Sequence, residues 1–469
     1  MNKRTSMLFT IAAVAVMGAT LFGSTYTQTQ IAGQSIDASK MDVTVLDQIR
    51  AMGGLELVMP EAFAETDCGA LENSGRTVVE FNLEGYSVEL PIMGGKTYNA
   101  MTFSGMVPGP TLRVTQGDVV KMTLHIPDWE VTGHGNDMHA SQITAGAFES
   151  VNPGETSQYC YIAESAGIFK YHCSGVKLVG MDQHVLSGMY GIAIVDPANG
   201  YKKLMVEKTS GSGELDRKFY SADALEFQLQ YNQLYLTPEG NYDAGAMFKH
   251  QNTATVVNGM QFGYVPNMAH NLLVNGDTNK NIFVAQPWNG LENKQYQSQL
   301  MFVENDQHVR LFIENQGNEP VFFHIVGEIL DRVTQGNRVQ SAATETWLLG
   351  GSQGMIVDLV FDEPGVYAAV NHDYAAIYTG AASIFVAGDP FGLNPVLVEK
   401  GVLEAPVPSY AYALGNPSDA VPPMGMNSIA HPAVNIHGLY TDEVASEMQE
   451  QGMIALWEVI PVVAEILTS

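Results

Sequence analysis

The chain has 469 residues, of which 46% are hydrophobic and 15% charged, and its formal net charge at pH 7 is −28. This length predicts about two to four domains with sizeable buried cores, and the composition excludes a disordered polyelectrolyte. The acidic balance argues against nucleic acid as a partner, because phosphate binding needs a basic surface.

The N-terminal segment, residues 1–24, has the features of an export signal. Lys3 and Arg4 precede a mostly apolar run from Met7 to Phe22, and small residues follow it. The run is short for a membrane span. We therefore expect a cleaved signal peptide and a periplasmic or otherwise exported protein, with a retained membrane anchor as the alternative.

The rest of the chain changes character at about residue 76. Residues 25–75 form a leader with a patch of helical character around Val43 to Met59. From residue 76 onward, short β-rich runs alternate with Gly, Pro and Asn, which is typical of a β-sandwich. One set of runs covers residues 76–200 and a second covers 210–390, separated by a connection from about Asn199 to Arg217.

The two sets resemble each other. SAGIFKYHC in the first set and EPGVYAAVNH in the second each lie one strand before a closing strand. We predict an all-β fold made of two tandem Greek-key sandwiches. A C-terminal extension, residues 391–469, follows and ends in a stretch of helical character from Thr441 to Leu467.

The stretch YHCSGVKLVGMDQHVLSGMYG, residues 171–191, contains the first candidate metal site. Cys173, His184 and Met189 follow in the order thiolate, imidazole, thioether. Two imidazoles, one thiolate and an axial thioether are the ligands of blue copper. The upstream motif HGNDMH supplies the missing imidazole, and we assign His134 to this site.

The remaining histidines indicate a second metal. His172 cannot share a metal with Cys173, because neighbouring side chains on a strand point to opposite faces. His139 is a further unassigned imidazole next to a ligand loop of the first half, and His324 and His372 lie in strand-like segments of the second half. Two metals joined through consecutive residues would have a short covalent path between them.

The chain resembles the copper-containing nitrite reductases, a family with two cupredoxin domains. The resemblance is carried by MVPGPTLRVTQGD (106–118), HGNDMH (134–139), VNPGE (151–155), GIFKYHC (167–173), HVLSGMYG (184–191), FHIVGEILD (323–331), ETW (345–347) and PGVYAAVNH (364–372). It runs from about residue 78 to 389. It implies two cupredoxin-like sandwiches and an oxidoreductase of denitrification that reduces nitrite to nitric oxide and water with one electron.

The resemblance also implies two coppers per chain. The ligands of type 1 copper, which accepts electrons, would be His134, Cys173, His184 and Met189. The ligands of type 2 copper, which binds nitrite, would be His139, His172 and, from the adjacent subunit of a homotrimer, His372. Electrons would pass from the first metal to the second through Cys173 and His172.

Five further residues match positions around the family's active site. Asp137 and His324 match the catalytic acid–base pair. Val326 matches the apolar residue that limits how the ligand lies on the metal. Glu345 and Thr346 match residues that surround the catalytic histidine.

The acidic surface suggests a basic partner, and we expect a small redox protein of cupredoxin or cytochrome c type as electron donor. Gln183 stands where some relatives have Trp before the copper-binding histidine. This loop helps to set the copper potential and the donor's docking surface.

Several alternatives stay open at the level of sequence. A multicopper oxidase that reduces oxygen needs about eight histidines, largely in His-x-His pairs, whereas this chain has 12 histidines and no such pair. The same two coppers could oxidise hydroxylamine or nitric oxide. A third alternative is an electron carrier with one blue copper, but it assigns no function to the second set of histidines. Cys68 and Cys160 could form a disulfide in an exported protein or remain separate thiols.

Overall fold

The computed structural model describes residues 28–31, 34–37, 68–92, 97–142, 150–176, 179–209, 211–259 and 300–389. The signal segment, the helical patch of the leader and the C-terminal extension lie outside these residues. Strands β1 (Gln28–Ile31) and β2 (Gln34–Asp37) pair in a unit of their own, formed by residues 1–66 and 143–148. In the part of the chain that is described, no helix has the length and apolar character that a bilayer span requires.

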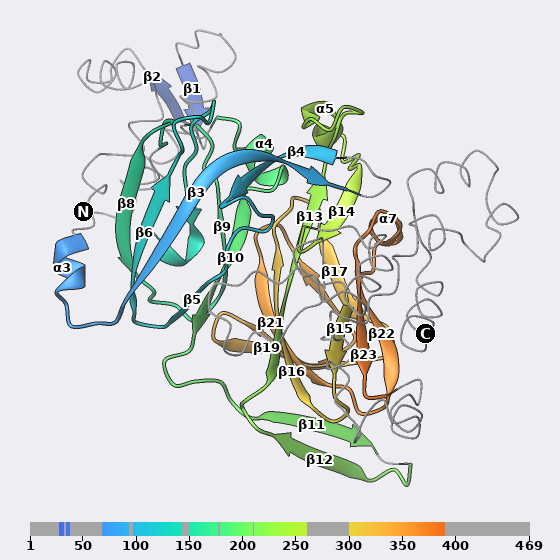
Figure 1. Cartoon of the computed structure of the whole chain (residues 1–469). Coiled ribbons are helices and arrows are strands. Elements are labelled where there is room, and N and C mark those ends of the chain that lie inside the picture. The colour runs from blue at the N-terminus through green and yellow to red at the C-terminus, as the bar shows by residue number, and fades with distance from the viewer. Residues whose placement is uncertain are drawn as a thin grey trace, which may run out of the picture. The chain divides into compact units, whose positions relative to one another are not determined.

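The first half of the larger unit contains two four-stranded sheets (Figure 1). One has the order β4-β3-β6-β8, from β4 (Thr97–Phe103), β3 (Val78–Pro91), β6 (Val119–His125) and β8 (Thr156–Ile162). The other has the order β5-β10-β9-β7, from β5 (Leu112–Thr115), β10 (Tyr190–Asp196), β9 (Gly167–His172) and β7 (Asp137–Met138). Tyr171 of β9 packs between Phe81 and Phe103 of the opposite sheet, at ring distances of 5.7 and 5.4 Å.

The second half repeats this plan with larger sheets. Its six-stranded sheet has the order β14 (Ala254–Val257), β13 (Leu225–Leu234), β16 (His308–Asn315), β21 (Gly354–Val360), β18 (Leu330–Gln335) and β19 (Arg338–Thr344). Its five-stranded sheet has the order β15 (Leu300–Val303), β23 (Ala382–Ala387), β22 (Gly365–Asn371), β17 (Val321–Ile325) and β20 (Thr346–Leu349). Phe227, Leu311, Phe323 and Phe385 belong to the buried core between them.

Strand pairing gives both halves the same connectivity. The first half has two parallel pairs, β3 with β6 and β5 with β10. The second half has β13 with β16 and β15 with β23, also parallel. The all-β prediction and the internal repeat are thus confirmed. The limits of the two domains, at 76–200 and 210–390, stay a prediction.

Two segments differ from the sequence-based expectation. The connection between the halves, for which no regular structure was predicted, contains a hairpin of β11 (Leu204–Thr209) and β12 (Leu215–Tyr220), at the lower edge of Figure 1. The expected copper loop contains a helix, α4 (Met181–Leu186). Six residues are too few to show a helical period in the sequence.

Cys68 and Cys160 form a disulfide with a Cα–Cα distance of 5.2 Å, which joins helix α3 (Cys68–Glu72) to strand β8. Cys173 is a buried free thiol.

The second sandwich packs against strand β9. Ile168 of β9 shares a buried cluster with Phe312 of β16 and Ile356 of β21. Beside this cluster, Arg113 of β5 pairs with Glu226 of β13 at 2.6 Å. The strand that leads to Cys173 is therefore held by both halves of the chain.

Candidate metal centres

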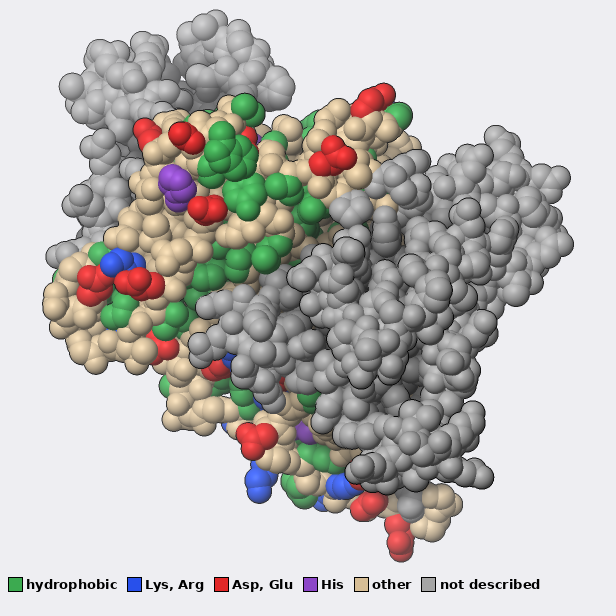
Figure 2. Space-filling model, in the orientation of Figure 1, with side chains coloured by type: hydrophobic (Ala, Val, Ile, Leu, Met, Phe, Trp, Pro, Cys, Tyr) green, Lys and Arg blue, Asp and Glu red, His purple; other side chains and the backbone are tan. Residues whose placement is uncertain are grey.

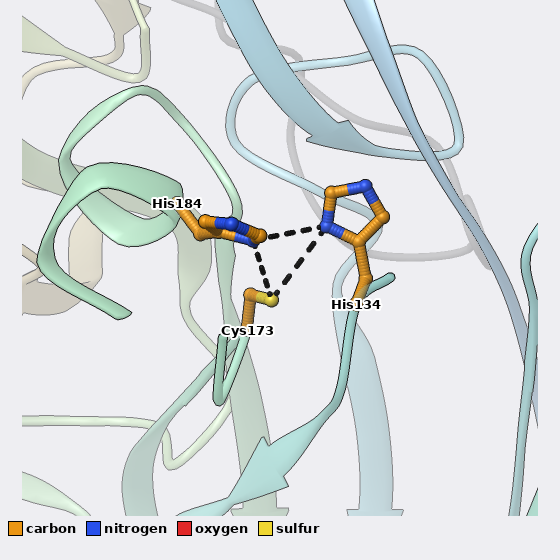
Figure 3. A group of neighbouring side chains, drawn as sticks. All are labelled: His134, Cys173 and His184. Carbon is orange, nitrogen blue, oxygen red and sulfur yellow. Dashed lines mark hydrogen bonds between the residues drawn. The ribbon is translucent and has the colours of Figure 1, made fainter. Parts of the chain in front are cut away.

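A thiol and two imidazoles converge in the first sandwich (Figure 3). Cys173 Sγ lies 3.2 Å from His184 Nδ1 and 3.8 Å from His134 Nδ1, and the two Nδ1 atoms are 3.0 Å apart. All three side chains are buried. The atoms that meet are two nitrogens and one sulfur, which is the donor set of a trigonal copper site.

Three different elements bring these side chains together. Cys173 directly follows β9, and His184 lies on α4. The segment before β7 places His134, which exchanges two backbone hydrogen bonds with Val151. Gly180 stands at the N-cap of α4 with φ of 69°, a conformation that glycine adopts without the steric cost of a Cβ.

Met189 lies next to this group. Its backbone N–H donates to His184 O and its carbonyl accepts from Cys173 N, so the histidine, methionine and cysteine segments are tied together. Its side chain is fully buried. A Cβ built on Gly85 would lie 2.9 Å from Met189 Cε and 3.4 Å from His134 Cβ, which places the thioether on the same side as His134.

The electrostatics of the group suit a metal ion. Burial lowers the pKa of His134 to about 4 and also lowers the pKa of His184, so both imidazoles are neutral at pH 7 and keep a lone pair. Burial alone raises the pKa of the Cys173 thiol to about 12, so the thiol keeps its proton until a bound cation displaces it. Backbone N–H groups of Gly135 and Gly175 donate to Sγ at 3.4 and 3.3 Å, contacts that favour a thiolate.

A second group lies on the other side of the same backbone. His139 Nε2 is 3.1 Å from His172 Nε2, which is 3.7 Å from Asp137 Oδ2. His172 Nδ1 faces its neighbour's carbonyl, Cys173 O, at 2.8 Å. Since Nδ1 must donate to that carbonyl, Nε2 keeps the lone pair and points into the group.

Burial also keeps the two imidazoles of this group neutral, the form that binds a cation. It lowers the pKa of His139 to about 4 and that of His172 to about 3, so both rings are neutral at pH 7. Burial raises the pKa of Asp137 to about 6, which makes this carboxyl able to hold or release a proton near neutral pH. Asp137 lies in β7 and pairs with His172 in β9.

The candidate residues of the second half form a separate group. The rings of His324 and His372 lie 5.1 Å apart. His324 Nδ1 is 3.0 Å from Glu345 O and 3.3 Å from Thr346 Oγ1, and these contacts hold its ring in place. Val326 follows β17 and is 48% exposed.

His372 stands apart from His139 and His172 within one chain. Two sets of ligand atoms converge to within 4.8 Å in the described residues: His134 with Cys173 and His184, and Asp137 with His139 and His172. His372 belongs to neither set, and its side chain is exposed. The second set thus has two imidazoles and one carboxylate in a single chain.

Some residues that contact or position the candidate ligands were not predicted from the sequence. The N–H groups of Gly135 and Gly175 act through the backbone, which residue types do not reveal. Tyr242 donates to Asp182 at 2.7 Å and so tethers α4, a contact between segments 60 residues apart. Lys170 is buried two residues before His172. A lysine inside the otherwise apolar run GIFKY was the available signal for it.

Comparison with known proteins places the chain in a family. Residues 87–200 match the family model of multicopper oxidases. A copper-containing nitrite reductase of Rhizobium sullae is 30% identical over 328 residues, covering 67% of this chain and 77% of that protein. The solved copper nitrite reductase from Nitrosomonas europaea is 29% identical, with a TM-score of 0.51, and the match covers 67% of this chain and 95% of that one. The resemblance seen in the sequence is confirmed: the chain belongs to the copper-containing nitrite reductases.

Proposed function

We propose that this chain reduces nitrite to nitric oxide and water, with one electron and two protons per nitrite. Family membership supports an oxidoreductase of the cupredoxin fold that uses copper and reduces nitrite. The observation that carries the finer proposal is the pair of converging sets on either side of the His172–Cys173 peptide bond. Copper bound by these sets supplies a one-electron couple at the first and a cationic position for an anion at the second.

The first set is suited to hold type 1 copper. His134, Cys173 and His184 provide the equatorial donors, and Met189 provides the axial thioether. The two N–H donors on Sγ favour the thiolate. Because Cys173 is bonded to His172, an electron that enters at the first set reaches the second through consecutive residues.

The second set is suited to hold type 2 copper once an adjacent subunit adds His372. Three neutral imidazoles would leave the net charge of the metal to attract nitrite despite the acidic surface. Exposed apolar side chains support a subunit contact here. Phe322 is 40% exposed, lies opposite Leu348 and belongs to the same strand as His324, while Tyr374 packs against His372. We propose a homotrimer that buries this face.

Asp137 and His324 are the residues that we propose handle the two protons. Cleavage of one N–O bond of nitrite releases an oxygen that leaves as water and takes up both protons. Asp137 holds a proton near neutral pH because burial raises its pKa. His324 is oriented by Glu345 O and Thr346 Oγ1 at Nδ1, which leaves Nε2 for exchange with the substrate. Val326 would limit how nitrite lies.

The cellular setting is also part of the proposal. The disulfide between Cys68 and Cys160 supports an oxidising compartment, such as the periplasm. The net charge of −28, and the acidic side chains scattered over the face in Figure 2, favour an electron donor with a basic surface. A small cupredoxin or cytochrome c in denitrification fits this description.

The substitution His139→Ala tests whether the first set accepts electrons and the second set binds nitrite, as proposed. His139 contacts His172 but none of the residues in the first set, so the variant is expected to keep its blue colour and lose nitrite turnover. Visible absorption and nitric oxide production are measured on the same preparation. Full turnover in this variant would refute the assignment of the second set, and loss of the blue band would refute the separation of the sets.

A further inference from the structure

Helix α4 carries His184, an imidazole of the first set, and has only six residues, Met181–Leu186. A helix of this length is not stable on its own in water, because nucleation costs more than so few hydrogen bonds return. The place of the His184 ring therefore depends on the contacts that α4 makes with other elements. Two of these contacts come from the second half of the chain.

Tyr242 holds the start of α4. Its hydroxyl donates to Asp182 Oδ2 at 2.7 Å, and Asp182 lies two residues before His184. Asp182 is exposed, whereas Tyr242 is half-buried. The contact thus joins a surface residue of the helix to a side chain that is anchored in the second half.

The turn that carries Tyr242, residues 236–243, is itself fixed on the first sandwich. Asn99 of β4 donates from its backbone N–H to Gly240 O at 2.9 Å and from its side chain to Asn241 Oδ1 at 2.7 Å. Gly240 has φ of 80°, and a Cβ there would lie 2.5 Å from a backbone oxygen at the start of β4, so this close approach requires glycine. The turn is therefore a firm support for Tyr242.

Asn232 of β13 holds the end of α4. Its Nδ2 donates to Leu186 O at 3.2 Å, and its side chain is fully buried. The last carbonyls of a helix have no partner within the helix, so this contact satisfies a group that needs one. The second half thus contacts α4 at both ends, with His184 between the two contacts.

We propose that Tyr242 and Asn232 are positioning residues that keep His184 in the trigonal arrangement of the first set and so raise the reduction potential of the copper held there. This inference rests on the proposed function, since it concerns the type 1 site. Cu(II) prefers a tetragonal arrangement of ligands, whereas the three donors of the first set converge in a trigonal one. A helix that is held at both ends resists relaxation towards the tetragonal form, which favours the reduced metal.

The substitution Tyr242→Phe tests the proposal, because it removes one hydroxyl and keeps the ring. We expect amide hydrogen exchange in residues 181–187 of the copper-loaded protein to become about fivefold faster, since one hydrogen bond to α4 is lost. We also expect the equilibrium constant for reduction of the blue copper to fall about threefold, which equals a decrease of about 30 mV in potential. Mass spectrometry and a potentiometric titration of the blue band measure these effects.

The substitution Tyr235→Phe is the matched control. The Tyr235 hydroxyl also donates to a carboxyl, Glu319 Oε1 at 2.7 Å, but this contact lies within the second half. We expect wild-type exchange in α4 and a wild-type potential in this variant. The substitution Asn232→Leu keeps the shape of the side chain and removes the donor at the other end of α4, so it should lower the potential as Tyr242→Phe does.

An unchanged or higher potential in Tyr242→Phe, with exchange in α4 as in the wild type, would overturn the proposal even if Asn232→Leu does not fold. An equal decrease in Tyr235→Phe would also overturn it, because the effect would then not depend on contact with α4. A wild type without a blue band would instead refute the type 1 assignment. None of these measurements depends on nitrite, so they are independent of whether the second set binds it.

Discussion

At the scale of single residues, the acid Asp137 stands beside the proposed type 2 ligands. Its Oδ2 atom lies 3.7 Å from His172 Nε2, and burial raises its pKa to about 6. A carboxyl with such a pKa exchanges protons with water at neutral pH much more readily than an exposed aspartate. The position suits a group that delivers a proton to an oxygen atom leaving nitrite.

The substitution Asp137→Asn is expected to keep both coppers and lose most of the turnover rate, about 100-fold, because the amide cannot deliver a proton. The pH dependence of the rate should change as well. Steady-state rates between pH 5 and 8 and the copper content of the same samples check this. An unchanged rate would remove Asp137 from the proton path.

Residue types in the sequence were enough to assign the first candidate set. His134, Cys173 and His184 were assigned from their order and chemistry, and their donor atoms do converge. Lys170 was missed, because a single lysine in a strand is usually exposed and its burial depends on the second sandwich. The disulfide stayed open, because only the fold shows that Cys68 lies near Cys160.

At the scale of elements, strand β9 and helix α4 position the first set. The pattern of apolar residues predicted β9 well, since it is a central strand between β10 and β7. The two residues of β7 and the six residues of α4 could not be predicted, because neither is long enough to show a period. Both become regular only through contacts made by distant segments.

Two buried carboxyls lie close together in sequence: Glu328 in the turn between β17 and β18, and Asp331 in β18. Burial raises the pKa of Glu328 to about 7 and that of Asp331 to about 6. The unfolded chain has lower values for both groups, so the folded state binds protons more tightly. Their contribution to stability is complete below about pH 4 and is lost as the pH rises to 7.

The double variant Glu328→Gln and Asp331→Asn is therefore expected to flatten the dependence of stability on pH. Between pH 4 and pH 7, the variant should lose about 2 kcal/mol less of its free energy of unfolding than the wild type loses. Urea denaturation at a series of pH values measures this. Parallel curves for the two proteins would contradict the account of this turn.

At the scale of the whole molecule, the two halves contribute different residues to the proposed active site. The first sandwich contains both converging sets, whereas the second contributes His324 and His372 on a partly apolar face. Single-chain sequence reasoning cannot place His372 against His139, because the contact depends on a neighbouring subunit. The family resemblance supplied that step, and it stays a prediction.

Mixing two inactive variants tests the shared site. A chain with His139→Ala retains its own His372, and a chain with His372→Ala retains its own His139. If the site lies between subunits, random co-assembly of equal amounts should restore about a quarter of the wild-type activity. Separately assembled variants, mixed without subunit exchange, are the control. No recovery after co-assembly would place the complete site within one chain.

The central claim is that one chain holds two different coppers, of which the second binds nitrite. A copper count combined with electron paramagnetic resonance before and after addition of nitrite tests it most directly. We predict about two coppers per chain, one of them type 1, and a nitrite-dependent change confined to the type 2 signal. A single copper per chain, or a type 2 signal that nitrite leaves unchanged, would contradict the claim.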